Sequence, residues 1–355
     1  MSRPTRQIWP TACALAMLMA LVTTTEVVEA REPTDYEQYM LELVNRARAN
    51  PNAEVARLSA EPWGAGGSAV PDLNEGPPTL GGEPWTIPSG PHQPLAFNLD
   101  IIDAAGDYAI LLNDNDAFTH TYGGTTPESR MTAAGYTPGA YTGAYGYTEP
   151  SHYVPGRENL SWSASFPPTG IFDLTAEVDS AHTGLFIDAE VPSRGHRSTM
   201  MYGEWQETGV GISTGTDQVD GDTWDSVYIV HDFAHQAGDP FLTGVAFDDA
   251  DLDNFYSPGE GRSGLGVEAY LAGTGTMVNS TTTFASGGYS LQLPAGSYDV
   301  RFFGQDIDQT FLGVDFTGGE NVKLDGVNLV PEPGSLVLTF LGSLCLALWA
   351  WRRRR

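Results

Sequence analysis

An acidic segment near residue 250 carries oxygen-bearing side chains at regular positions. Side-chain oxygens stand at positions 1, 3, 5, 9 and 12 of residues 249–260, and a backbone carbonyl is available at position 7. The side chains belong to Asp249, Asp251, Asp253, Ser257 and Glu260, and the carbonyl belongs to Phe255. Calcium takes several oxygen ligands in this order from one short loop. The segment therefore predicts a calcium-binding loop.

Position 6 of this loop is occupied by Asn254. An EF-hand calcium loop has glycine there because the backbone turns sharply, and asparagine is the next most tolerant residue of the left-handed conformation. The flanking segments have the alternation of strands, whereas an EF-hand has helices. We expect a calcium loop inserted in a β-module, and the alternative is a solvated acidic turn.

Histidine and glutamate side chains in residues 31–238 could bind a second metal. Neutral imidazoles and a carboxylate can hold zinc and leave positions open for water or ligand. We expect the acidic composition to raise imidazole pKa values and to weaken metal binding at mildly acidic pH. The alternative is that each histidine is a hydrogen-bonded structural residue. The pair His231 and His235 also has ligand-like spacing, but it follows a predicted strand, so we interpret it as strand-end packing.

Helices and strands must position these residues. From Asp35 to Asn50 apolar residues recur every three or four positions, which predicts a helix with one buried stripe that ends at Pro51. Leu99 to Leu112 is a second periodic segment, and residues 209–212 and 226–230 read as central strands.

Several motifs in residues 33–238 together resemble the CAP superfamily, named for cysteine-rich secretory proteins, antigen 5 and pathogenesis-related proteins. They are the helix sequence 41–51, the turn Phe118-Thr-His120, the segment Arg157-Glu-Asn-Leu160 and the segment Gly195-His-Arg197. The resemblance implies an α-β-α three-layer sandwich with His120, Glu158 and His196 in one cleft, where they are the candidate ligands of a zinc ion.

The family has a fourth cleft residue, a glutamate on the helix before the Gly-His motif. At that place the sequence offers Glu177, Asp179 and His182. A related bacterial subgroup has an Ala-His-x-x-Leu-Phe segment here. This resemblance favours His182 as the fourth ligand, with Glu177 in reserve.

The composition changes at Gly238-Asp-Pro240, which separates residues 31–238 from residues 239–329. The second part has short alternating runs divided by glycine-containing turns, which predict a small antiparallel sandwich of seven or so strands. Residues 283–298 resemble carboxypeptidase regulatory-like modules and the B-type repeats of surface adhesins. The overall expectation is an α+β protein, a CAP-type sandwich followed by an all-β module.

The two ends read as targeting segments. Residues 1–30 have the basic, apolar and small-residue regions of a signal peptide. Residues 330–355 resemble a PEP-CTERM sorting signal, in which Pro331-Glu-Pro333 precedes a membrane-spanning apolar run and Arg352 to Arg355. The resemblance implies an exosortase-type partner and a transient membrane anchor, and the alternative is an ordinary tail anchor. Both cysteines, Cys13 and Cys345, fall in these segments, so we expect no disulfide.

The formal net charge of −28 excludes nucleic acid as a partner and favours cations. The two end segments lead us to expect an exported protein of the cell envelope, cell surface or extracellular matrix, and the CAP resemblance implies that its cleft binds a lipid, glycan or peptide. The alternative is a metal-dependent, protease-like hydrolase in which Glu158 acts as general base or ligand. No Gly-x-Ser-x-Gly elbow is present, which argues against an ordinary serine hydrolase.

Overall fold

The computed structural model describes residues 31–60, 79–80, 83–84, 91–139, 157–188, 195–304 and 307–329. The predicted signal peptide and sorting tail lie outside these residues, as does most of the glycine- and proline-rich insertion. In the insertion, β1 (Thr79–Leu80) pairs with β2 (Glu83–Pro84). None of the helices formed by the described residues is long and apolar enough to cross a membrane.

The predicted first helix is confirmed as α1 (Asp35–Ala49), which is followed by α2 (Pro51–Ala60). Thr34 and Glu37 form a capping box, in which the Thr34 side chain accepts from Glu37 N and the Glu37 side chain accepts from Thr34 N. This box satisfies two backbone donors that a helix N-terminus otherwise leaves unpaired. The acidic first turn and the basic last turn also match the helix dipole.

A four-stranded sheet in the order β3-β5-β6-β4 forms the middle layer of residues 31–238. Its strands are β3 (Ala96–Phe97), β5 (Glu207–Val219), β6 (Asp222–Ala234) and β4 (Glu158–Ser165). β5 and β6 form a hairpin whose two turn residues, Asp220 and Gly221, both have positive φ. Such a turn matches the twist of the strands that it joins.

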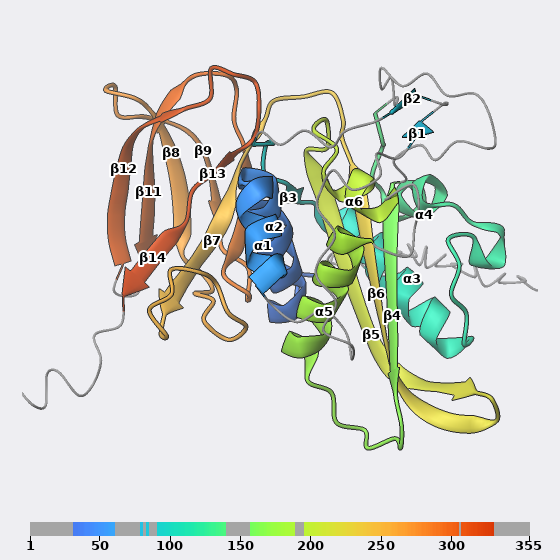
Figure 1. The fold of residues 1–355 in the computed structure, drawn as a ribbon. Helices are drawn as coiled ribbons and strands as arrows, with labels where there is room; N and C mark the ends of the chain where they lie inside the picture. Colours follow the sequence, from blue (N-terminus) through green and yellow to red (C-terminus); the bar gives the residue numbers. More distant parts are fainter. Residues whose placement is uncertain are drawn as a thin grey trace, which may run out of the picture.

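Helices cover both faces of this sheet (Figure 1). One face carries α3 (Leu99–Asp114) and α4 (Pro127–Ala134), joined through η1 (Tyr122–Gly124). The other carries α1, α5 (Leu174–Ile187) and α6 (Gly195–Met200). Gly209 and Gly211 bring β5 close to α3, because a Cβ at either position would stand 2.3 Å from an α3 backbone carbon. The predicted α-β-α layers are present.

Residues 239–329 form a β-module of two sheets. One sheet contains β7 (Phe241–Asp249), β10 (Gly288–Gln292), β13 (Val322–Lys323) and β14 (Gly326–Leu329). The other has the order β12-β11-β8-β9, with bounds Ile307–Asp315, Ser297–Gly304, Gly266–Leu271 and Thr276–Thr282. The sheets enclose an apolar core that includes Leu242, Val267 and Phe302.

The expected antiparallel pattern is not complete. β13 and β14 pair with β7 in parallel, because the chain crosses from β12 in the second sheet before it returns beside β7. The prediction of a small sandwich is therefore correct in its layers but wrong for these two strands.

The β-module packs directly on α1, so the two parts share a core at a common seam. Val245, Phe247 and Tyr256 belong to the same buried cluster as the apolar stripe of α1. At the seam, Lys323 Nζ lies 2.9 Å from Glu42 Oε2 and also pairs with Asp325. Burial would lower the pKa of Lys323, but the two carboxylates raise it above its usual value. This ion pair ties β13 to the first helix.

We expect the Lys323→Met variant to lose on the order of 3 kcal/mol of unfolding free energy, because Glu42 would keep a buried charge without its cation. Adding Glu42→Gln to the same chain should restore most of this loss, since no uncompensated charge then remains. Urea denaturation of the single and double variants measures both values. Additive losses in the double variant would contradict the pairing.

Candidate functional site

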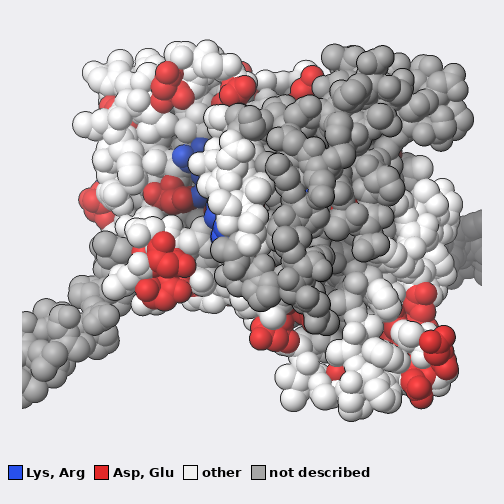
Figure 2. Space-filling model, in the orientation of Figure 1, with Lys and Arg blue, Asp and Glu red and all other residues white. Residues whose placement is uncertain are grey.

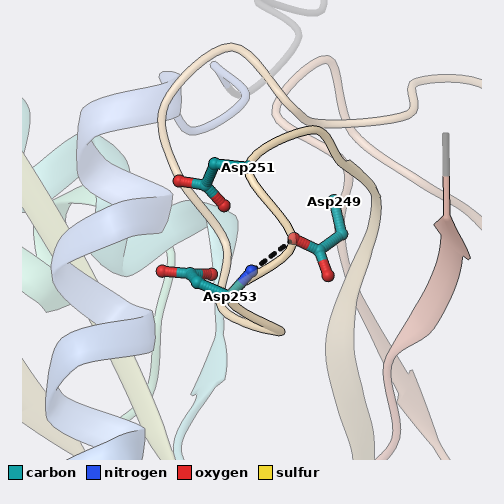
Figure 3. Close-up of side chains that lie close together, drawn as sticks. All are labelled: Asp249, Asp251 and Asp253. Atoms are coloured by element: carbon teal, nitrogen blue, oxygen red, sulfur yellow. Dashed lines mark hydrogen bonds between the residues drawn. The ribbon is translucent and has the colours of Figure 1, made fainter. Parts of the chain in front are cut away.

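The acidic loop begins at Asp249, the last residue of β7, whose side chain is fully buried. Its two carboxylate oxygens accept hydrogen bonds from Asp253 N and Asn254 N, both at 3.1 Å. Figure 3 shows the first of these bonds. Each carboxylate oxygen has a second lone pair, so these bonds orient Asp249 and leave it able to bind a cation.

Asp251 and Asp253 complete a cluster with Asp249. One ligand oxygen from each of the three carboxylates lies within 4.8 Å of the others, although Asp251 and Asp253 are exposed. Figure 3 shows the three side chains around one small space inside the loop. Among the described residues this is the group of three or more His, Cys, Asp or Glu side chains that is close enough to hold a metal ion. Three carboxylates at this separation repel one another, and a divalent cation would relieve the repulsion.

The loop backbone has the predicted conformation at position 6. Asn254 has φ 60°, in the left-handed region that was expected for the residue in place of glycine, and Leu252 has φ 64°. Glu260 closes the loop, because its Oε1 accepts from Ala250 N at 2.9 Å and its Oε2 accepts from Ser257 N at 2.7 Å. Of the predicted calcium ligands, the structure gathers the three aspartates. Glu260 accepts from the Ser257 backbone N–H, and the ligand roles of Glu260, the Ser257 hydroxyl and the Phe255 carbonyl stay predictions.

The loop is anchored to α1 by the residues that follow the cluster. The Phe255 ring lies 6.1 Å from the Tyr39 ring, and the Arg46 guanidinium lies over it at 4.5 Å. Tyr256 is buried, and its hydroxyl donates to Asp35 O at 3.4 Å. In the described part of the face in Figure 2, the visible basic side chains lie together beside the β-module with an acidic side chain next to them, and other acidic side chains are scattered. The conformation of the loop therefore bears directly on the seam.

His120 and Glu158 lie close together in the structure. His120 Nδ1 lies 2.7 Å from Glu158 Oε1, and Arg130 forms a buried ion pair with Glu158 Oε2. The Arg130 guanidinium lies 3.4 Å from the centre of the Tyr108 ring. These residues lie between β4 and the helices α3 and α4.

His196 has other hydrogen-bond partners. Its Nδ1 lies 2.9 Å from Asp188 Oδ1, and its backbone carbonyl accepts from Asn159 Nδ2 at 3.0 Å. Glu158 and Asn159 are consecutive in β4, so their side chains point to opposite faces. His196 therefore does not join His120 and Glu158 in a compact ligand set. The zinc site of His120, Glu158 and His196 therefore stays a prediction.

The three candidates on α5 also have other partners. Glu177 Oε2 accepts from Ser163 Oγ at 2.6 Å, and Asp179 Oδ1 accepts from the Tyr39 hydroxyl at 2.9 Å. His182 is fully buried, and its Nε2 lies 2.9 Å from Glu54 Oε1. His182 is thus paired with Glu54 of α2, and its role as fourth ligand stays a prediction.

His231 is a packed residue of β6, as the sequence indicated. It is fully buried, stacks on Phe233, and its Nε2 lies 2.8 Å from Thr208 Oγ1. The Thr208 hydroxyl donates to Asp232 O, so the His231 ring donates to Thr208. Burial lowers the pKa of His231 to about 3 and also lowers the pKa of His182. The expectation that the acidic composition raises imidazole pKa values is wrong for these two residues, because burial outweighs distant charges.

Two residues beside Glu158 were missed at the sequence level. Asp232 is its cross-strand partner on β6, and burial, reinforced by the Glu158 charge, raises the pKa of Asp232 well above its usual value. A polar residue inside the apolar run of β6 was the available signal. The sequence gave no such signal for Arg130, because a single arginine near the start of a helix is common on protein surfaces.

No protein-family model matches the chain, and no curated protein is significantly similar to it. Similar solved structures include an outer surface protein from Borrelia burgdorferi, with 15% identity, 40% of this chain and 78% of that chain covered, and a TM-score of 0.22. BmVAL-1, a venom allergen-like protein of the CAP/SCP family, has 14% identity, 59% and 82% coverage, and a TM-score of 0.30. A 9R-lipoxygenase from Cyanothece has 13% identity, 26% and 16% coverage, and a TM-score of 0.19. At these TM-scores none of the similarities carries an argument about fold or function.

The buried His231 should make the protein less stable as the pH falls. Its folded pKa lies below the unfolded value of about 6.5, so the unfolded state binds the extra proton first. The stabilising effect of the neutral ring is complete above pH 6.5 and is lost as the pH falls toward 3. We expect His231→Gln to reduce the slope of unfolding free energy between pH 4.5 and 5.5 by about 1.4 kcal/mol per pH unit.

Thr208→Val is the matched control for this measurement. It removes the hydrogen-bond partner of the ring and keeps the titrating group, so it should lower stability without the same reduction in slope. An unchanged slope in His231→Gln would contradict the proposed origin of the acid sensitivity.

Proposed function

We propose that this chain is an exported calcium-binding protein that acts by binding a ligand rather than by catalysis. In this proposal, calcium in loop 249–260 fixes the β-module against α1. The observation that carries it is the cluster of Asp249, Asp251 and Asp253, whose ligand oxygens lie within 4.8 Å of one another. Calcium is the cation of choice because the donors are all hard oxygens on a flexible loop.

Several further observations support calcium at this place. Asn254 has the left-handed backbone that the ligand order requires at position 6, and the net charge of the chain favours cations. Asp249 is pre-oriented by two backbone N–H groups, which lowers the entropy lost when a cation binds. Phe255 and Tyr256 contact Tyr39 and Asp35 of α1, so a cation that orders the loop would also hold it against this helix.

The proposed binding role of residues 31–238 rests on the CAP-like sequence motifs and on the three-layer arrangement of the described helices and sheet. Export to the envelope, surface or matrix, with an exosortase-type partner, rests on the sequence of residues 1–30 and 330–355. A lipid, glycan or peptide is the proposed class of ligand for this part.

Binding is favoured over metal-dependent hydrolysis by the contacts of Glu158. A general base or zinc ligand needs a carboxylate directed toward substrate or metal. Both oxygens of Glu158 are engaged, one by Arg130 and the other by His120, so the residue serves as a buried counter-ion. The Glu158 carboxylate thereby balances the buried charge of Arg130.

Calorimetry on the purified protein should detect one calcium ion per chain with a Kd of about 10⁻⁴ to 10⁻³ M, the usual range of extracellular modules. At free calcium near 100 times the Kd, the folded state should gain about 2.7 kcal/mol. Asp251→Ala should weaken calcium binding at least tenfold, because an exposed carboxylate is removed from the cluster while the backbone bonds to Asp249 and Asp253 remain.

The control is Asp222→Ala, which removes an exposed carboxylate from the start of β6, outside the loop. It should leave the calcium affinity unchanged. Equal losses of calcium affinity in the two variants would show that net charge causes the effect. Absence of calcium binding to the wild-type protein at millimolar calcium would rule out the proposal.

A further inference from the structure

The hairpin of β5 and β6 extends beyond the end of α3 (Figure 1). The last turn of α3 reaches Gly215, where a Cβ would stand 2.7 Å from the Asn113 side chain. Residues 216–225 of the hairpin therefore lie past this helix. Aromatic side chains are exposed beside them: Trp162 of β4 is 38% exposed, and Phe166, just after β4, is 56% exposed.

Trp162 is held across the sheet by a buried carboxylate. Its Nε1 donates to Asp217 Oδ2 at 2.6 Å, and the Tyr228 hydroxyl donates to the same oxygen at 2.7 Å. Trp162 belongs to β4 and Asp217 to β5, and β6 runs between these two strands. The indole therefore lies over β6, on the side of the sheet that α3 covers further along, and leaves its outer side to solvent.

This use of Asp217 is unfavourable for stability. The residue is only 4% exposed, and its other oxygen, Oδ1, is buried without a hydrogen-bond partner among the described residues. A buried acceptor left in this state is costly. An apolar residue in its place would avoid that cost but would leave the exposed indole of Trp162 free to change rotamer. The arrangement is explained if a ligand requires the indole in one orientation.

Phe166 and Trp224 provide a second aromatic surface on the same face. Their ring centroids are 5.2 Å apart, with the ring planes inclined at 41°. Trp224 pairs with Asp217 in the sheet, so both point to the side that Trp162 occupies. The four residues from Trp162 to Phe166 advance the chain by about 13 Å. The rings thus form a row that is longer than a single sugar ring.

The charges around the row select an uncharged partner. No lysine or arginine occurs in residues 158–171 or 198–261, which include β4 and the whole hairpin. An anionic glycan, a nucleic acid or an anionic lipid surface would meet carboxylates there without a cation to pair with. A small cation would occupy one ring and leave the rest of the row unused. The exposed carboxylate of Asp222 lies on the same face and can accept from hydroxyl groups.

We propose that this face of β4 and the β5–β6 hairpin binds an uncharged oligosaccharide, whose sugar rings stack on Trp162 and on the pair Phe166 and Trp224. Sugar rings have apolar C–H faces that pack on aromatic rings, and hydroxyl groups that donate to carboxylates. The proposal rests on the proposed binding role of residues 31–238 and specifies a glycan as the ligand. Calcium titration tests loop 249–260 separately, so either activity can fail without the other.

Calorimetry of the full protein with the neutral hexasaccharides cellohexaose, chitohexaose and laminarihexaose tests the proposal. At least one should bind, and more tightly than glucose, because glucose covers one ring only. Trp162→Ala should weaken this binding at least about tenfold, as truncation of a tryptophan anchor does in other interfaces. Leu312→Ala is the control, because it removes an exposed apolar side chain from β12 of the β-module. It should bind as the wild-type protein does.

Trp162→Phe tests the fixed orientation separately, because phenylalanine keeps an aromatic ring and cannot donate to Asp217. Its affinity should fall between those of the wild-type protein and Trp162→Ala. Failure of the wild-type protein to bind any of the three hexasaccharides would overturn the proposal. Equal affinity in Trp162→Ala, equal affinity for glucose, or preferential binding of anionic oligogalacturonate or of choline would also overturn it.

Discussion

Burial of α1 on all sides is the constraint on which the rest of the structure depends. A helix in this position must satisfy polar side chains as well as pack its apolar stripe, because each unpaired buried group costs about 1–3 kcal/mol. Asn45 exchanges hydrogen bonds with the backbone of Leu95, and Arg48 donates to the carbonyls of Gln93, Met200 and Tyr202. Glu42 takes Lys323 from the β-module. The partners come from segments far apart in the chain, so α1 fixes the sheet, α6 and the module relative to one another.

The alternation of side chains along β4 explains why the polar residues of residues 31–238 fall into two groups. Glu158 joins His120 and Arg130 beneath α3 and α4, whereas Asn159 joins the His196 segment beside α5 and α6. The first group includes the buried ion pair of Arg130 with Glu158, and in the second Asp188 accepts from the His196 backbone N–H and contacts its ring. The single metal cleft that the motif order implied stays a prediction.

The sequence predicts best what is determined locally. The helix over residues 35–49 follows from its periodicity and from Pro51, and the loop at residues 249–260 follows from the order of its oxygens, including the left-handed Asn254. The pairing of Glu42 with Lys323 could not be predicted, since nothing near either residue indicates the other. The placement of His182 also depended on a distant partner, Glu54. The parallel pairing of β13 and β14 with β7 could not be predicted either, because the alternation of apolar and polar residues indicates a strand but not its direction.

Calcium in loop 249–260, as proposed, strengthens the attachment of the β-module to α1. Hydrogen–deuterium exchange of the full protein in calcium and in chelator tests this most directly, because it reports on the loop and on the helix in one experiment. We expect slower exchange with calcium at the amides of residues 253–255 and also along α1, since Phe255 and Tyr256 contact the helix. Slower exchange confined to the loop, or no change in either segment, would contradict the proposed attachment.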